Sequence, residues 1–336
     1  MKHDAWRAAI AVGRTQHGVI CNGQFRQLGF SSERVRTRVR RGDLVGTLPG
    51  VWRFASAQPT KLQSLWSAML WSKHGVVCAN SAAQLWAFEG VHAQHAHIMV
   101  PNTVNPRHAS VLVRRVQTID LADVRHRDGL TVATPELTII QLSGELKARD
   151  FEVAFESARR LRLVTVESVH KTLERVGSSG RRGTRELQVL LSELKGTAAC
   201  DSVLEVDTAR LLRDHHIEAP SRQHPVTAFG KRYFVDFAWP HRRVFLECFG
   251  RNPHDDPARW AADYDRLSAL AAATGWTPIV TTWTEVHRHP TKLVAKLDAA
   301  LRGHGQTGPN HHSGLLRSGR ATQTSGALNE RTRIST

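Results

Sequence analysis

Three carboxylates in the C-terminal third of the sequence could hold a divalent cation. Glu205 stands one turn into a predicted helix, and Asp236 stands near the end of a predicted strand. Glu247 lies inside an otherwise apolar strand, where a carboxylate is unfavourable unless something compensates its charge. An ion shared by Asp236 and Glu247 would compensate it, and oxygen ligands are those that Mg²⁺ or Mn²⁺ prefers.

Such a site has the chemistry that hydrolysis of a nucleic-acid backbone requires. A bound metal lowers the pKa of a water ligand and neutralises a phosphodiester. His254, seven residues past Glu247, could act as general acid or base because the pKa of histidine lies near neutral pH. The predicted catalytic residues are Glu205, Asp236, Glu247 and His254, and the predicted metal ligands are Asp236 and Glu247.

Each of these residues also has a structural interpretation. Ser202 and Glu205 have the spacing of a helix capping box. Asp236 could point to solvent from a strand end. Glu247 could pair with Arg266. Arg266 could instead contact a scissile phosphate, or it could form an ordinary ion pair on its own helix.

A second candidate site is an arginine-rich helix near the N-terminus. Over residues 31–42, Arg34, Arg38 and Arg41 share one helical face. Val35 and Val39 lie on another face and would dock the helix on a core. This is how a DNA recognition helix is built, with guanidinium groups facing phosphates and guanine edges, although an ordinary solvated helix face can also be rich in arginine.

The surrounding elements fit that role. Residues 4–56 predict three short helices and a hairpin, in which Arg53 would contact a second stretch of DNA backbone. Residues 61–176 predict a mixed α/β region with a helical end, and the Gly- and Ser-rich stretch 177–183 predicts a linker and the main domain boundary.

Residues 184–302 predict a small α/β domain. Its mixed sheet contains strands over 223–228, 233–238, 243–249 and 277–282, and a closing helix covers 284–301. Residues 303–336 are poor in large apolar residues and are expected to be disordered. The predicted fold class is therefore α/β, or α+β, in several domains.

Charge and composition limit the class of protein. The 336 residues carry a net charge of +16, and residues 1–60 hold ten basic and three acidic side chains, which indicates a polyanionic partner. No apolar run approaches the ~18–20 residues of a membrane-spanning helix, and no signal peptide is visible. The four cysteines lie far apart, as reduced buried thiols would. We expect a cytoplasmic protein without a membrane partner.

The N-terminal part resembles a known family. Its match consists of the runs Gly18-Val19-Ile20, Leu28-Gly29-Phe30-Ser31, residues 38–45, residues 49–53, residues 81–86, Val100-Pro101 and residues 128–135. These look like the N-terminal winged helix-turn-helix domain of AbiEi-type antitoxins. The resemblance implies binding to promoter DNA and a cognate toxin.

The C-terminal part resembles the Vsr-like branch of the PD-(D/E)XK nucleases. The match runs through residues 203–205, 235–240, 247–250, His254, 263–266, Gly275-Trp276 and Trp283. It implies a restriction-endonuclease-like mixed sheet flanked by helices, and a Mg²⁺-dependent DNA endonuclease. Phe249 stands where that branch commonly has an acid, so one candidate ligand is missing. We therefore expect a protein that binds double-stranded DNA and cleaves it, or a non-catalytic antitoxin and repressor.

Overall fold

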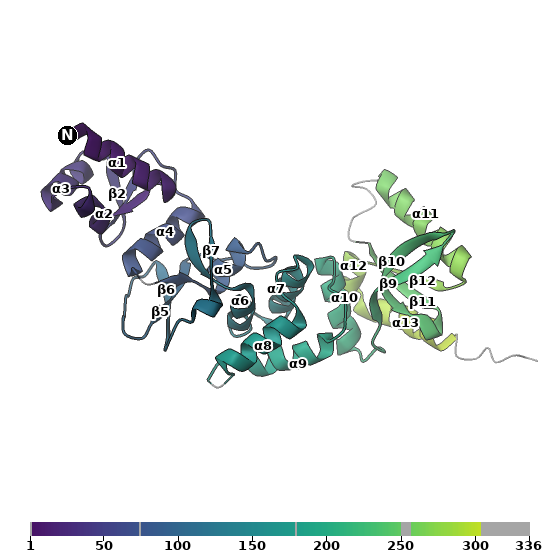
Figure 1. The fold of residues 1–336 in the computed structure, drawn as a ribbon. Helices are drawn as coiled ribbons and strands as arrows, with labels where there is room; N and C mark the ends of the chain where they lie inside the picture. Colours follow the sequence, from purple (N-terminus) through teal and green to yellow (C-terminus); the bar gives the residue numbers. More distant parts are fainter. Residues whose placement is uncertain (1, 74, 179, 250–256, 304–336) are drawn as a thin grey trace, which may run out of the picture.

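The computed structural model describes residues 2–73, 75–178, 180–249 and 257–303. Within these ranges the chain forms thirteen α-helices and three β-sheets, which is a mixed α/β structure. The elements form three units that follow one another along the molecule (Figure 1). We name them the N-terminal unit (2–54), the central unit (61–194) and the C-terminal unit (203–303). His254 and residues 304–336 lie outside the described ranges.

Three helices and a small antiparallel sheet make up the N-terminal unit. Its sheet has the order β1-β3-β2, and the predicted helices and hairpin are present, with the short strand β1 in addition. Ser31 Oγ accepts a hydrogen bond from the backbone N–H of Arg34 and so caps the third helix. The elements are α1 (Lys2–Thr15), β1 (Val19–Cys21), α2 (Asn22–Gln27), α3 (Ser32–Arg40), β2 (Leu44–Leu48) and β3 (Val51–Phe54).

A five-stranded sheet and six α-helices make up the central unit. The strand order is β6-β5-β4-β8-β7, and β5–β6 and β4–β8 are its parallel pairs. Its elements are α4 (Lys61–Ser72), β4 (Val76–Val77), α5 (Ala79–Leu85), β5 (Ala96–Pro101), β6 (Val111–Val116), a 3₁₀ turn (Leu121–Asp123), β7 (Val124–Arg127), β8 (Leu130–Ala133), α6 (Pro135–Leu142), α7 (Ala148–Arg160), α8 (Val166–Val176) and α9 (Thr184–Leu194).

The apolar cores divide after α9 rather than at residues 177–183. Leu187, Leu190, Leu191 and Leu194 of α9 pack into the same core as α6, α7 and α8. Gly183 lies so close to Ser143 that a Cβ placed on it would come within 2.0 Å of the Ser143 carbonyl oxygen. The end of the stretch predicted as a linker, at Arg182 and Gly183, is therefore packed against the end of α6, and α9 packs with the central unit.

The C-terminal unit is a four-stranded mixed sheet between helices. Its order is β12-β11-β10-β9, with β11 and β12 parallel and the other pairs antiparallel. One face of the sheet packs with α10, α12 and α13 through Phe237, Trp239 and Leu246; the other packs with α11 through Val235 and Phe245. The elements are α10 (Val203–Asp214), β9 (Ser221–Ala228), β10 (Lys231–Trp239), a 3₁₀ turn (Pro240–Arg242), β11 (Val244–Phe249), α11 (Pro257–Thr274), β12 (Thr277–Thr282), α12 (Trp283–Arg288) and α13 (Pro290–Gly303).

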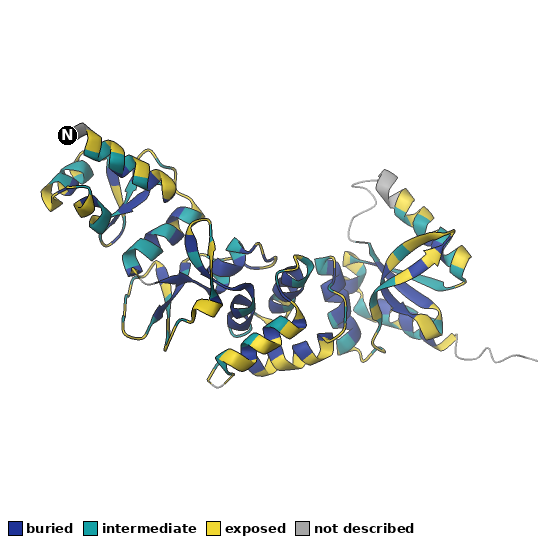
Figure 2. Ribbon diagram, viewed as in Figure 1, coloured by how far each residue is buried: buried dark blue, intermediate teal, exposed yellow. Residues whose placement is uncertain are grey.

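Ion pairs join the central unit to the C-terminal unit. Glu152 of α7 accepts hydrogen bonds from Arg210 and Arg213 of α10. Glu156 of α7 contacts Arg222 of β9 at 2.9 Å. Figure 2 shows the buried sides of α7 and α10 turned toward each other at this seam. The two units are thus held by charge as well as by apolar packing.

No helix in the described ranges is long and apolar enough to span a membrane. All four thiols are free; Cys78 and Cys200 are buried as predicted, whereas Cys21 and Cys248 are only half-buried.

Candidate functional site

The predicted acidic residues meet where the C-terminal sheet forks. Strands β10 and β11 pair only from Phe237 with Leu246 to Trp239 with Val244. Beyond that point β11 continues beside β12, and β10 continues beside β9. Asp236 and Glu247 are the next residues on either side of the fork. The backbone N–H of Cys248 donates to Asp236 Oδ2 at 2.8 Å, so the fork is closed by a side chain instead of a ladder hydrogen bond.

Gln223 of β9 ties two of the carboxylates together. Its Nε2 donates to Glu205 Oε2 at 3.1 Å and to Asp236 Oδ1 at 3.3 Å. The backbone of Gln223 has a φ of 46°, a left-handed conformation that is uncommon for residues other than glycine. Strained backbone of this kind is concentrated at functional sites, where the surrounding structure holds it in place.

Glu205 is both a helix cap and a member of this group. Ser202 Oγ accepts from the N–H of Glu205 at 3.2 Å, which is one half of the predicted capping interaction. Glu205 Oε1 accepts from Ser202 Oγ at 2.9 Å, and Oε2 accepts from the N–H of Asp201 at 2.8 Å. The two interpretations of Glu205 are compatible, because the cap leaves Oε2 within reach of Gln223.

Glu247 forms the ion pair with Arg266 that the sequence allowed. Arg266 Nη2 lies 2.7 Å from Glu247 Oε1, and only 5% of the Glu247 side chain is exposed. Arg266 reaches from α11 and is itself one-third exposed, so its guanidinium group lies at the edge of the site. Glu205, Asp236 and Glu247 are named below as the carboxylate cluster.

Burial raises the pKa of each member of the carboxylate cluster, and repulsion by Asp236 adds to the rise for Glu205 and Glu247. Burial, followed by the charge of Asp236, raises the pKa of Glu205 to about 7. The same two causes raise the pKa of Glu247 to about 8, against the opposing effect of Arg266, and a hydrogen bond with Asp236 adds to the rise. Burial also raises the pKa of Asp236. Near neutral pH the cluster therefore holds protons that exposed carboxylates would have lost.

The residues present fit a cation held by Asp236 and Glu247. Their oxygens are hard ligands, and a cation would compensate the cost of burying their negative charges. Arg266 already provides part of this compensation at Glu247 Oε1. In the part of the chain that the structure describes, no group of three or more His, Cys, Asp or Glu side chains is arranged to hold a metal.

The arginines of α3 fall into two groups. The guanidinium groups of Arg34 and Arg38 lie 4.3 Å and 4.0 Å from the ring centroids of Phe30 and Trp6. Arg38 also pairs with Asp43 at 2.8 Å. Arg41 is exposed and has no side-chain partner among the described residues. Within the predicted set, Arg34 and Arg38 thus help to hold the helix in place, and Arg41 faces solvent.

Two exposed arginines join Arg41 on the solvent side of α3. Arg36 and Arg40 both pair with Glu33, and their side chains are about 70% exposed. Arg53 turns back to donate to the carbonyl oxygens of Phe54 and Ala57. Val35 is buried and Val39 is partly buried in the N-terminal core, as predicted.

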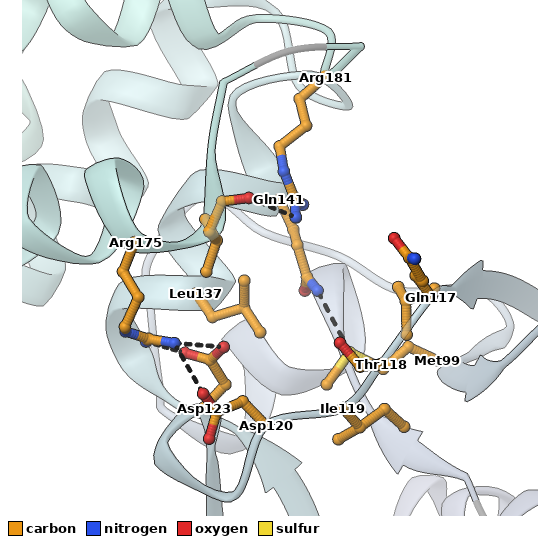
Figure 3. Close-up of a pocket in the computed structure, with 12 residues that line it drawn as sticks. Met99, Gln117, Thr118, Ile119, Asp120, Asp123, Leu137, Gln141, Arg175 and Arg181 are labelled. Atoms are coloured by element: carbon orange, nitrogen blue, oxygen red, sulfur yellow. Dashed lines mark hydrogen bonds and ion pairs between the residues drawn. The ribbon is translucent and has the colours of Figure 1, made fainter.

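A separate pocket of about 270 Å³ lies in the central unit (Figure 3). Arg175 pairs there with Asp123 and, at 3.4 Å, with Asp120. Gln141 accepts a hydrogen bond from the N–H of Ala79 at 2.8 Å. These three charged side chains and Gln141 thus bind one another or the backbone, which is the pattern of a structural network.

Sequence reasoning identified the carboxylate cluster and Arg266 but missed Gln223. A signal for it is present in the sequence, because Phe229-Gly230 can form a two-residue turn. Counting outward from such a turn places residue 223 opposite Asp236. The sequence contains no signal for the left-handed backbone conformation that directs Gln223 toward the carboxylates.

Comparisons with known proteins give a distant relationship. No family model matches the chain. The uncharacterized protein Rv2248 of Mycobacterium tuberculosis is 26% identical over 272 residues, which cover 80% of this chain and 96% of that protein; the uncharacterized protein MT2308 of another strain matches equally. The crystal structure of the Rv2827c protein of M. tuberculosis aligns with a TM-score of 0.39 and 18% identity over 56% of this chain and 76% of that one. The chain is thus distantly similar in sequence to uncharacterized proteins of M. tuberculosis.

Proposed function

We propose that the chain is a DNA-binding protein whose C-terminal unit hydrolyses DNA phosphodiester bonds with Mg²⁺ or Mn²⁺. In this proposal the N-terminal unit is a winged helix-turn-helix domain and the C-terminal unit has a restriction-endonuclease-like fold. The observation that carries the nuclease is the fork between β10 and β11, which brings Asp236 and Glu247 together with Glu205. Buried acids with raised pKa values at one point of a fold are candidates for a functional site.

Each residue has a defined part in this function. Asp236 and Glu247 would hold the cation, which supplies an activated water and charge neutralisation when bound. Gln223 and the N–H of Cys248 fix the orientation of the Asp236 carboxylate. Arg266, at the edge of the site, could pass from Glu247 to a phosphate oxygen once a cation compensates Glu247. Glu205 supports the arrangement through Gln223.

Cleavage of a supercoiled plasmid tests the proposal. We expect the purified full-length protein to nick the plasmid in Mg²⁺ or Mn²⁺, and to stop when EDTA is added. Asp236→Ala and Glu247→Gln should each lower the rate at least 100-fold. Glu285→Gln is the matched control, because Glu285 is an acid of the same unit with a 12% exposed side chain that pairs with Lys296 outside the cluster. Equal nicking by the wild type and Asp236→Ala would remove the enzymatic function.

A second candidate is a non-catalytic repressor of a toxin–antitoxin operon. The observation that favours it is the 2.7 Å ion pair of Glu247 with Arg266, which compensates part of the charge of the buried carboxylate without a metal. The phenylalanine at position 249 agrees with this alternative. Binding of the protein to a DNA fragment of its own promoter in a gel-shift assay, without cleavage of that fragment, would support the repressor function.

The exposed arginines of α3 are the DNA contacts in both candidates. We expect replacement of Arg36, Arg40 and Arg41 with alanine to weaken DNA binding and to reduce its salt dependence, because each lost phosphate contact lowers the slope by about 1. A fluorescence-anisotropy titration at several salt concentrations measures both effects.

A further inference from the structure

The hairpin of β9 and β10 extends past the rest of its sheet. The two strands pair from residues 221 and 238 to residues 228 and 231, whereas β11 reaches β10 only at residues 237–239. Residues 224–235 thus form a two-stranded ribbon beyond the fork. Helix α11 covers one face of the ribbon, where Val226 and Val235 are buried. The tip and much of the opposite face are exposed (Figure 2).

The tip of the ribbon carries an unfavourable residue. The pairing of Ala228 with Lys231 leaves Phe229-Gly230 as a two-residue turn, with φ values of 50° and 72°. Turns with two positive φ values favour Asn-Gly, and an aromatic residue is disfavoured at the first position. The Phe229 side chain is also 77% exposed, so neither local conformation nor packing explains its presence. Contact with another molecule would explain the presence of Phe229 at this position.

The ribbon has the charge of a surface that binds polyanions. Residues 224–235 include Lys231 and Arg232 and contain no Asp or Glu. The ammonium group of Lys231 lies 5.5 Å from the ring centroid of Tyr233, and the guanidinium group of Arg232 lies 5.1 Å from that of Phe234. These ring contacts hold the two cations along the ribbon. The local charge is notable because residues 201–302 as a whole are nearly neutral, with fourteen basic and thirteen acidic side chains.

We propose that this ribbon binds in the major groove of double-stranded DNA, with Lys231 and Arg232 on phosphates and Phe229 against base edges. A major groove about 12 Å wide admits a two-stranded β-ribbon, and an aromatic side chain can contact the thymine methyl group there. Strand β10 runs directly from these residues to Asp236, about 23 Å from Phe229 at about 3.3 Å per residue. DNA held along the ribbon would therefore reach the carboxylate cluster. The inference rests on the proposed DNA-binding function and names the surface that holds the substrate.

Replacing the two cations tests the phosphate contacts. Lys231→Ala combined with Arg232→Ala should weaken binding of a 20-base-pair duplex about tenfold at 150 mM salt and lower the salt slope by about 2. Arg302→Ala is the control, since Arg302 is a 79% exposed arginine of α13 on the same unit. An unchanged slope in the double variant would overturn the proposal. Tighter binding of RNA than of DNA through the same residues would also overturn it.

Replacing Phe229 separates binding from folding. Phe229→Asn creates the preferred Asn-Gly turn, so the melting temperature should stay the same or rise, while DNA affinity should fall five- to tenfold. The control Leu121→Ala removes an 87% exposed apolar side chain from the central unit and should leave affinity unchanged. Full affinity in Phe229→Asn would overturn the role of the tip.

Photo-crosslinking distinguishes failure of this inference from failure of DNA binding itself. Full-length protein is irradiated on a duplex that contains 5-iodouracil, and the crosslinked tryptic peptides are identified by mass spectrometry. We expect crosslinks in the peptides 223–231 and 233–242. Crosslinks confined to residues 1–60 would overturn the ribbon contact but preserve DNA binding by the N-terminal unit. No crosslink and no shift in a gel would overturn DNA binding and the ribbon contact together.

Discussion

Gln223 shows how one polar side chain can hold two acids together. Its amide nitrogen donates to Glu205 and to Asp236, which keeps those carboxylates close in spite of their repulsion. The left-handed backbone at Gln223 is what turns the amide toward them. A polar residue that orients a ligand in this way commonly determines metal affinity as much as the ligand does.

Shortening this side chain should weaken cation binding. Asparagine tolerates left-handed backbone, so Gln223→Asn keeps the strand but is one methylene too short to bridge both acids. We expect the affinity for Mn²⁺, measured by isothermal titration calorimetry, to fall 10- to 100-fold. The control Gln117→Asn changes an exposed glutamine in the central unit and should bind Mn²⁺ as the wild type does. Wild-type affinity in Gln223→Asn would mean that the bridge does not orient Asp236.

The raised pKa of Glu247 makes stability depend on pH in a definite direction. In the unfolded chain the carboxyl loses its proton near pH 4.5, whereas in the folded protein it keeps the proton up to about pH 8. The folded state therefore binds more protons between these values, and the free energy of unfolding must fall as pH rises through this window. Above about pH 8 this contribution stops changing.

Glu247→Gln should flatten that dependence. The amide has no proton to lose, so in EDTA the variant should be more stable than the wild type by about 2 kcal/mol at pH 8 and similar to it at pH 5. Urea denaturation at pH 5, 6.5 and 8 gives the three values. Parallel curves for the two proteins would show that Glu247 is ionised throughout.

Helix α3 combines two kinds of arginine. Arg34 and Arg38 lie over aromatic rings, and the apolar seam of Val35 docks the helix on the N-terminal core. The sequence predicted one binding face from angular spacing alone. Spacing specifies which side chains share a face, but it does not show whether the long arginine side chain folds back onto a neighbouring ring.

Alanine substitution should distinguish the two kinds of arginine by their effect on the free energy of unfolding. Arg38→Ala removes a contact with Trp6 and an ion pair with Asp43, both partly exposed, so we expect a loss of about 1 kcal/mol in the free energy of unfolding. Arg41→Ala should change it by less than about 0.5 kcal/mol. Chemical denaturation followed by circular dichroism compares them. Equal losses in the two variants would contradict this division of α3.

Regular elements were more predictable than their interruptions. The strand predicted over 277–282 is present as β12, and the mixed sheet is confirmed. The closing helix predicted over 284–301 is instead α12 and α13, divided at His289. Pro290 explains the break, because a residue before proline is disfavoured in a helix and His289 takes a φ of −136°. The packing of α9 depends on contacts far apart in sequence, which local patterns do not report.

The seam between the central and C-terminal units contains a partly buried charge network. Removing Glu152 would leave Arg210 and Arg213 facing each other in a half-buried place. We expect Glu152→Ala to lower the free energy of unfolding by about 2 kcal/mol, because the remaining charges lose their compensation. Glu193→Ala is the control, since the more exposed Glu193 touches Arg213 only at 3.4 Å. Equal melting temperatures of the two variants in calorimetry would contradict a stabilising role of the seam.

The seam has a geometric consequence for any duplex that spans the molecule. Ion pairs join α7 to α10 and β9, and Val19, Leu48 and Val51 of the N-terminal unit pack into the core of the central unit. In the proposed function, cleavage would then occur at a fixed distance from the recognised sequence. Substitutions that weaken the seam would broaden the distribution of cleavage positions.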